Sequence, residues 1–97
     1  MSHDRPWWLY ILETVHGQLY TGVTIDVERR LKEHAKGAPK GARALRGKAP
    51  LILRYQCVIG SKSAALRAEY AIKRLPRTRK IDLIAGNAVL NELIADQ

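Results

Sequence analysis

The chain has 97 residues, the size of one compact domain, and 46% of them are hydrophobic while 27% are charged. This composition is that of an ordinary globular protein and excludes a largely disordered chain. We therefore expect a single domain over residues 1–97, with residues 1–6 flexible. The one cysteine, Cys57, excludes an internal disulfide bond and a cysteine-rich zinc site. Because no apolar run approaches membrane-spanning length and the first residues lack an apolar signal core, we expect a cytoplasmic protein that does not bind membranes.

The net charge of +8 is unevenly distributed along the chain. Between Lys36 and Lys80 there are thirteen Lys or Arg residues and a single acid, Glu69. A surface that only keeps a protein soluble mixes both signs, whereas such a basic stretch is typical of proteins that follow the phosphates of a nucleic acid. We therefore expect a polyanionic partner, with a solvated, solubilising surface as the alternative.

The first part of the chain predicts a hairpin followed by a helix. Residues 7–14 and 19–25 are rich in aromatic and β-branched residues, and the turn signal His16-Gly17 lies between them. Asp26 is then the expected N-cap of a helix that ends near Lys36. Its apolar residues recur with helical spacing, at Val27, Leu31 and Ala35.

The second part begins with a long segment, residues 37–50, which holds three Gly, two Pro and four basic residues and is expected to be a functional loop. A third strand follows over residues 51–59. Three further helices are expected: 64–75, capped by Ser61 or Ser63 and ended by Pro76, then 78–85 and 87–95, separated by Gly86. The order strand-strand-helix-strand-helix-helix-helix predicts an α+β fold, with a small three-stranded, mainly antiparallel sheet flanked by helices.

Tyr10 and Tyr20, one on each strand of the hairpin, are the first candidates for a functional site. Half-buried strand aromatics are the ordinary alternative for both. Arg30 and His34 stand at positions i and i+4 of the first helix, so they face the same way at the rim of the core. A solvated helix edge is the alternative for this pair.

Glu69 is the next candidate, because it is the only carboxylate in the basic half of the chain. It lies beside the apolar face of its helix, and a salt bridge to Lys73 at i+4 would be its ordinary role. A lone carboxylate among cations is also what a phosphoryl-transfer site with one Mg²⁺ needs, since Mg²⁺ is held by one or two carboxylates together with waters and phosphate.

These residues arrive in a specific order. The sequence contains Trp8-Leu9-Tyr10, then Tyr20-Thr21-Gly22, then the helical runs 29–34 and 65–73. This series resembles the GIY-YIG nuclease family over nearly the whole chain, in particular its small stand-alone YhbQ-like members. The nuclease domain of structure-specific branched-DNA endonuclease subunits is also similar.

The resemblance implies a metal-dependent endonuclease that hydrolyses DNA phosphodiester bonds, with structure selectivity and a role in DNA repair or recombination. It places the catalytic residues at Tyr10, Tyr20, Arg30, His34 and Glu69. Arg30 would stabilise negative charge, His34 would hold the phosphate or relay a proton, and Glu69 would bind one Mg²⁺ or Mn²⁺. Either tyrosine could be the general base. DNA would be bound by Arg29, Lys36, Lys40, Arg43, Arg46, Lys48 and Lys73, and a protein partner would supply recognition of branched or damaged DNA.

Three positions depart from the family pattern. Trp8-Leu9 replaces Gly-Ile, Val23 stands where the excision-repair members have a lysine, and Ile81 stands where many members have an asparagine. Gly22 is expected to let the phosphate approach the backbone. A shared site also requires an odd-numbered hairpin loop, such as His16-Gly17-Gln18, or a bulge, because a two-residue loop would put the two tyrosines on opposite faces of the sheet.

Other functions remain open at this point. A basic nucleic-acid-binding module without catalysis shares the charge and the loop, but leaves Glu69 unexplained. An RNA-directed protein is the next alternative, and a purely structural interaction protein is the last.

Overall fold

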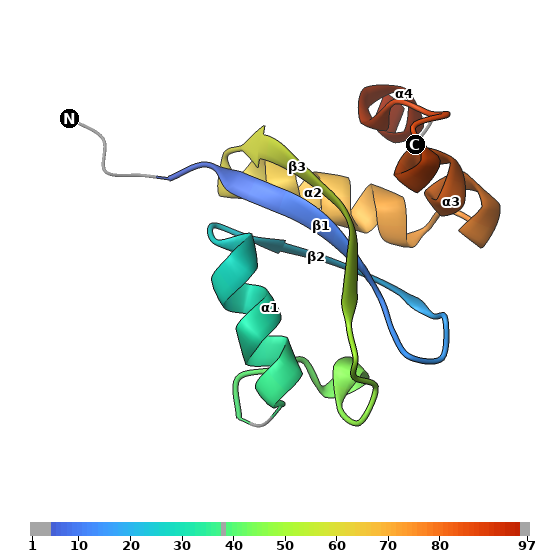
Figure 1. The fold of residues 1–97 in the computed structure, drawn as a ribbon. Coiled ribbons are helices and arrows are strands. Elements are labelled where there is room, and N and C mark those ends of the chain that lie inside the picture. The colour runs from blue at the N-terminus through green and yellow to red at the C-terminus, as the bar shows by residue number, and fades with distance from the viewer. Residues whose placement is uncertain (1–4, 38, 96–97) are drawn as a thin grey trace.

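Figure 1 shows the computed structural model of the chain, which describes residues 5–37 and 39–95. Strands β1 (Trp7–Glu13), β2 (Leu19–Thr24) and β3 (Ile52–Gly60) form one antiparallel sheet in the order β2-β1-β3. The helices are α1 (Val27–Lys36), α2 (Lys62–Lys73), α3 (Arg77–Ala85) and α4 (Leu90–Ala95). The predicted α+β class and the order of the elements are confirmed. Most of the expected flexible segment, residues 1–4, lies outside the described residues.

The segment predicted to be a loop contains one element that sequence patterning did not predict. A short 3₁₀ helix, η1 (Arg43–Leu45), lies within residues 37–50, and its Leu45 is only 3% exposed. The loop prediction did not include this short helix. A buried leucine anchors the basic segment to the core, because it removes an apolar side chain from water.

The boundaries of α2, α3 and α4 differ from the prediction by one to three residues, and the starts of α2 and α4 have identifiable reasons. Ser61, and not Ser63, caps α2, since its Oγ accepts a hydrogen bond from the backbone N–H of Ala64 at 3.1 Å. Helix α4 begins at Leu90, three residues later than expected. The backbone N–H of Asn87 instead bonds the carbonyl of Asp82 at 2.8 Å and completes the end of α3, where Gly86 is left-handed at φ 82°.

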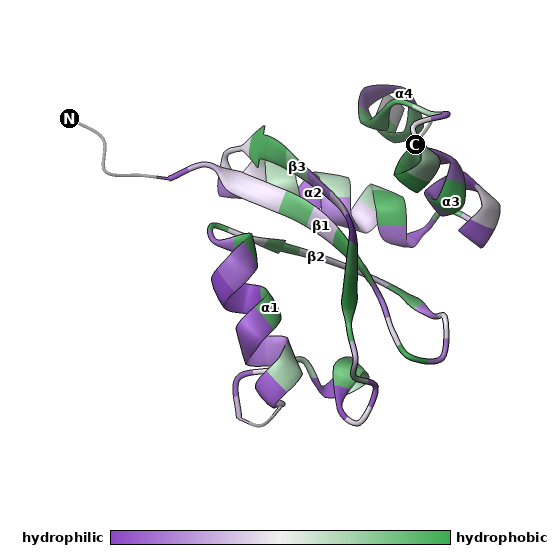
Figure 2. Ribbon diagram, viewed as in Figure 1, coloured by the Kyte–Doolittle hydropathy of each residue, from purple (hydrophilic) through white to green (hydrophobic). Residues whose placement is uncertain are grey.

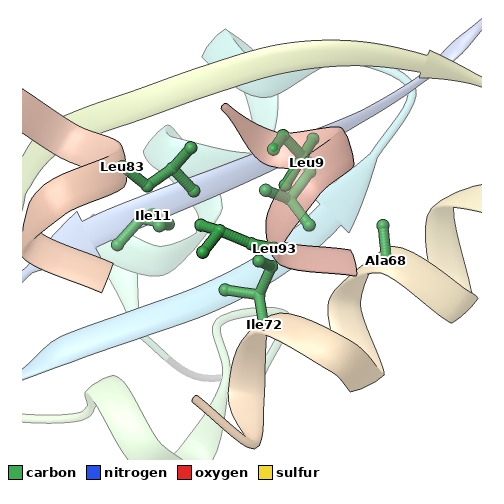
Figure 3. Packing of buried hydrophobic residues seen from close by; sticks show 7 residues of the cluster. Leu9, Ile11, Ala68, Ile72, Leu83 and Leu93 are labelled. Carbon is green, nitrogen blue, oxygen red and sulfur yellow. The ribbon is translucent and has the colours of Figure 1, made fainter. Parts of the chain in front are cut away.

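The central strand β1 is buried on both faces of the sheet. On one face Leu9 and Ile11, both 0% exposed, meet Ala68 and Ile72 of α2 (Figure 3). The same cluster takes in Leu83 of α3 and Leu90 and Leu93 of α4. Fully burying such an aliphatic side chain contributes about 1.5–3 kcal/mol relative to leaving it exposed. Helices α2, α3 and α4 are thereby fixed on this face.

The opposite face of the sheet carries α1 and η1. Tyr10, Leu12 and Leu45 form its buried cluster, and the partly buried Val27 and Leu31 of α1 pack against them. The predicted apolar stripe of α1 was wrong at its last position, because Ala35 is exposed and His34 is buried at 2% exposure. Figure 2 shows that the rest of α1 is largely hydrophilic. A histidine thus occupies a core-facing position of this helix.

The hairpin register puts both motif tyrosines on one face. Leu12 is the partner of Tyr20 and Tyr10 is the partner of Gly22, with five residues, 14–18, between the two strands. Since side chains alternate along a strand, Tyr10, Leu12 and Tyr20 point to the same side. The predicted odd-numbered loop is confirmed. No helix within the described ranges is long and apolar enough to span a membrane.

Candidate active site

The two tyrosines and His34 form a compact aromatic group. The ring centroids of Tyr10 and Tyr20 are 6.5 Å apart, and the His34 ring lies 6.1 Å from Tyr10 and 5.6 Å from Tyr20. These three side chains come from β1, β2 and α1, which the hairpin and the α1 packing bring together. The residues predicted from separate motifs therefore face one another in space.

Two hydrogen bonds determine which tautomer the His34 ring adopts. Its Nδ1 accepts the backbone N–H of Ala42 at 3.1 Å, and its Nε2 lies 2.9 Å from the Oη of Tyr10. Because Nδ1 is an acceptor, the proton of the neutral ring is on Nε2, which donates to Tyr10. Burial, and secondarily the charge of Arg30, lowers the pKa of His34 to about 4. The imidazole is therefore neutral at physiological pH, with both nitrogens engaged.

Tyr10 is the more enclosed of the two tyrosines. Its side chain is 1% exposed, and burial, followed by the proximity of Tyr20, raises the pKa of its phenol. A Cβ placed at Gly22 would collide with the Oη and Cζ of Tyr10. The expectation that Gly22 leaves room for a phosphate is thus corrected, because the phenol of Tyr10 lies across the glycine and uses that space.

Arg30 joins α1 to Tyr10 on one side and to the basic segment on the other. Its Nη1 donates to Oε1 of Glu33 at 2.9 Å and to the backbone carbonyl of Lys40 at 2.7 Å. The guanidinium also interacts with the Tyr10 phenol and opposes the rise of its pKa. Arg30 is held on three sides, so its positive charge has a defined position next to Tyr10.

Glu69 approaches this group from α2. Its charge reaches Tyr10, where it adds a small contribution to the raised pKa of the phenol, after the larger effects of burial and of Tyr20. Oε2 of Glu69 lies 3.2 Å from Nζ of Lys73, which is also 6.0 Å from the centre of the Tyr20 ring. Lys73 was predicted to contact DNA, and the structure places it beside the candidate catalytic residues.

The other predicted DNA-binding residues lie on α1 and on the segment that follows it. Arg29, Lys36 and Lys40 line a groove of about 360 Å³. A second hollow of about 400 Å³ is lined by Lys36 and Arg46 and reaches His34. Arg43 is exposed and Lys48 is half-buried. These cations form a basic rim, defined here as Arg29, Lys36, Lys40, Arg43, Arg46 and Lys48.

The donor atoms fit one hard divalent cation and no richer metal centre. The described residues contain no group of three or more His, Cys, Asp or Glu side chains that could hold an ion. Zinc needs three or four protein ligands, whereas Mg²⁺ is commonly held by one or two carboxylates, waters and substrate phosphate. Glu69, whose side chain is 20% exposed, can supply the single carboxylate.

Residues 6–82 match the GIY-YIG catalytic domain. This chain belongs to the GIY-YIG family. The GIY-YIG domain is a nuclease domain, and a nuclease acts on nucleic acid.

Similar GIY-YIG proteins include small stand-alone bacterial chains. The UPF0213 protein YhbQ of Escherichia coli O1:K1 is 49% identical over 90 residues, which cover 93% of this chain and 88% of that protein. The solution NMR structure of the UPF0213 protein BH0048 of Bacillus halodurans is 44% identical with a TM-score of 0.53, over 81% of this chain and 82% of that one. The NMR structure of EF2693 of E. faecalis is 30% identical with a TM-score of 0.61, over 89% and 90%.

Three contributors to the site were missed by sequence reasoning. The backbone N–H of Ala42 and the backbone carbonyl of Lys40 hold His34 and Arg30, and Glu33 binds Arg30 through its carboxylate. Backbone groups of a loop leave no signal in residue identity, so the first two could not be found from the sequence. Glu33 could have been found, because it stands three residues after Arg30 on one helix.

Acid should destabilise the protein through His34. The pKa of this side chain is about 4 in the folded state and 6.5 ordinarily, so the unfolded chain takes up the proton first as the pH falls. Stability is therefore complete above about pH 6.5 and is lost towards pH 4, on the order of 1–2 kcal/mol between pH 7 and pH 5. Urea denaturation at both pH values measures this loss.

Two variants isolate the histidine in that experiment. His34→Gln should have a smaller loss of stability between the two pH values, while His16→Gln, at an exposed position, should behave as the wild type. An unchanged pH dependence in His34→Gln would contradict the assignment.

Proposed function

We propose that this protein is a metal-dependent endonuclease that hydrolyses phosphodiester bonds of DNA. The observation that carries the proposal is the convergence of two phenols, one guanidinium and one carboxylate on a single place, beside a rim of cations. Hydrolysis of a phosphodiester needs an activated water, positive charge near the phosphoryl oxygens and help for the leaving oxygen. The residues of this site can be assigned to each requirement.

The proton of the attacking water must pass to a phenolate oxygen, which becomes a phenol, and Tyr20 is the better placed of the two tyrosines for this role. Its side chain is partly exposed, whereas Tyr10 is buried and receives the Nε2–H of His34. Because His34 donates to Tyr10, the hydroxyl proton of Tyr10 is free to point to another acceptor, such as a phosphoryl oxygen. His34 is then a positioning residue for Tyr10, and its buried ring favours this role over direct contact with the phosphate.

Arg30 and Glu69 provide the electrostatic part of the proposal. The guanidinium of Arg30, fixed by Glu33 and Lys40, stabilises negative charge that develops on the phosphoryl group. Glu69 would hold one Mg²⁺ or Mn²⁺, and the ion would supply positive charge to stabilise the departing 3′ oxygen.

The basic rim supports DNA as the substrate. Its cations lie on α1 and on the segment around η1, and one of the two hollows that they line reaches His34 of the aromatic group, so a phosphate backbone bound there would lie close to the candidate site. We propose further that the protein acts in the cytoplasm on branched or damaged DNA in repair or recombination, with a protein partner that supplies substrate recognition.

Replacing Glu69 tests the enzyme proposal directly. Glu69→Gln should lower the rate of Mn²⁺-dependent cleavage of linear, flap and junction DNA by about a hundredfold or more, while DNA affinity stays nearly unchanged. Glu28→Gln is the matched control, because Glu28 is a highly exposed acid on α1. Cleavage by Glu69→Gln at the wild-type rate would remove the metal role, and no cleavage by the wild type would leave a DNA-binding protein.

Removing one hydroxyl tests the role of Tyr20. Tyr20→Phe should lower turnover by about a hundredfold or more, since the acceptor of the water proton is lost while the ring remains. Tyr70→Phe, at a position 65% exposed on α2, should cleave normally. Single-turnover rates with excess enzyme give both values, and equal rates for the two variants would exclude Tyr20 as the base.

The basic rim should govern affinity and its dependence on salt. Arg43→Ala and Arg46→Ala should each weaken DNA binding and flatten the slope of log affinity against log salt concentration by about 1 for a lost phosphate contact. Arg77→Ala on α3, which Figure 1 places well away from η1, should leave the slope unchanged. Fluorescence anisotropy at several salt concentrations measures the slopes, and three equal slopes would count against this path for DNA.

A further inference from the structure

Lys73 forms a pair with Glu69 at the edge of α2 that lies next to the candidate active site. The two residues stand at positions i and i+4, on the border of the face that buries Ala65 and Ile72. Nζ of Lys73 lies 3.2 Å from Oε2 of Glu69, and it also lies over the Tyr20 ring at 6.0 Å. The backbone of Lys73 lies on the exposed side of the helix with Leu66 and Tyr70, and its side chain reaches back to Glu69 and Tyr20.

The pair creates a conflict with the metal role of Glu69. An ammonium group already lies against the carboxylate that the proposed function assigns to a divalent cation. The Glu69 side chain is only 20% exposed, while that of Lys73 is 51% exposed, so the lysine is the partner that can move into solvent. Two cations on one carboxylate repel each other, and the repulsion is stronger for a divalent ion in a partly enclosed site.

We propose that Lys73 occupies Glu69 in the metal-free protein and must leave it when a divalent cation binds. Lys73 is then a positioning residue that lowers the metal affinity of the site. This inference rests on the proposed function, because it takes Glu69 as the metal ligand. It assigns Lys73 a role distinct from that of the basic rim, whose cations bind DNA without competing for a carboxylate.

The ordinary alternative makes a different prediction. An exposed i,i+4 salt bridge on a helix contributes only a few tenths of a kcal/mol to helix stability and has no particular effect on metal binding. Removing Lys73 would then change the Mn²⁺ affinity no more than removing another lysine of α2. Lys62 provides this comparison, because it lies on the same helix with its Nζ over the ring of Trp7 at 5.5 Å.

The test is a direct measurement of Mn²⁺ binding without DNA, by electron paramagnetic resonance of the free ion. Lys73→Met should bind Mn²⁺ about three- to tenfold more tightly than the wild type, since the competing charge is gone. Lys73→Arg should stay near the wild type because the charge is kept, and Lys62→Met should shift affinity by less than about twofold. A gain of affinity cannot arise from damage to the fold.

Several results would contradict the proposed role of Lys73. Equal affinity of Lys73→Met and Lys62→Met, weaker binding by Lys73→Met, or tighter binding that persists in the Glu69→Gln/Lys73→Met double variant would each overturn the inference. A wild type that binds no Mn²⁺ would overturn it as well. If Glu69→Gln loses cleavage while Lys73→Met leaves the Mn²⁺ affinity unchanged, the inference alone fails and the endonuclease proposal stands.

Discussion

The hydrogen bonds that run from the Ala42 amide through the His34 ring to the Tyr10 hydroxyl join three parts of the molecule. They tie the basic segment to α1 and α1 to the central strand. A buried polar ring is tolerated there because both of its nitrogens have partners, whereas an unsatisfied nitrogen would destabilise the fold. The orientation of Tyr10, the tautomer of His34 and the position of the loop at Ala42 all depend on this connection.

Much of the fold could be predicted from the sequence, because its local signals agree with one another. The aromatic and β-branched strands around His16-Gly17, the Asp26 cap and the Gly86 stop each indicate the element that the structure contains. Reasoning from strand alternation also determined that the two tyrosines share a face only with an odd-numbered loop. Periodicity failed where a polar residue is buried, at His34, and where a short helix lies in a glycine-rich segment, at η1.

The candidate site could be predicted as a set of residues but not as an arrangement. Spacing and resemblance identified the five candidate side chains, and i,i+4 spacing indicated the Glu69–Lys73 salt bridge, but nothing in the residue types shows that Gly22 accommodates a phenol or that Lys73 also lies over the Tyr20 ring. These relations depend on how the sheet twists against α2 and on how the loop closes over α1. Tertiary packing of this kind is set by many weak contacts together, so single residues do not reveal it.

The central strand places the site and the core on opposite sides of one backbone. Tyr10 stands between Leu9 and Ile11, whose side chains enter the cluster under α2 and α4. A displacement of the strand by half an ångström, caused by repacking on the helical side, therefore moves the phenol by the same amount. In a genetic screen for inactive alleles, changes at Leu9, Ile11 and Ile72 would appear alongside changes at the tyrosines. Substitutions that repack the interior of this small protein therefore also affect its candidate site.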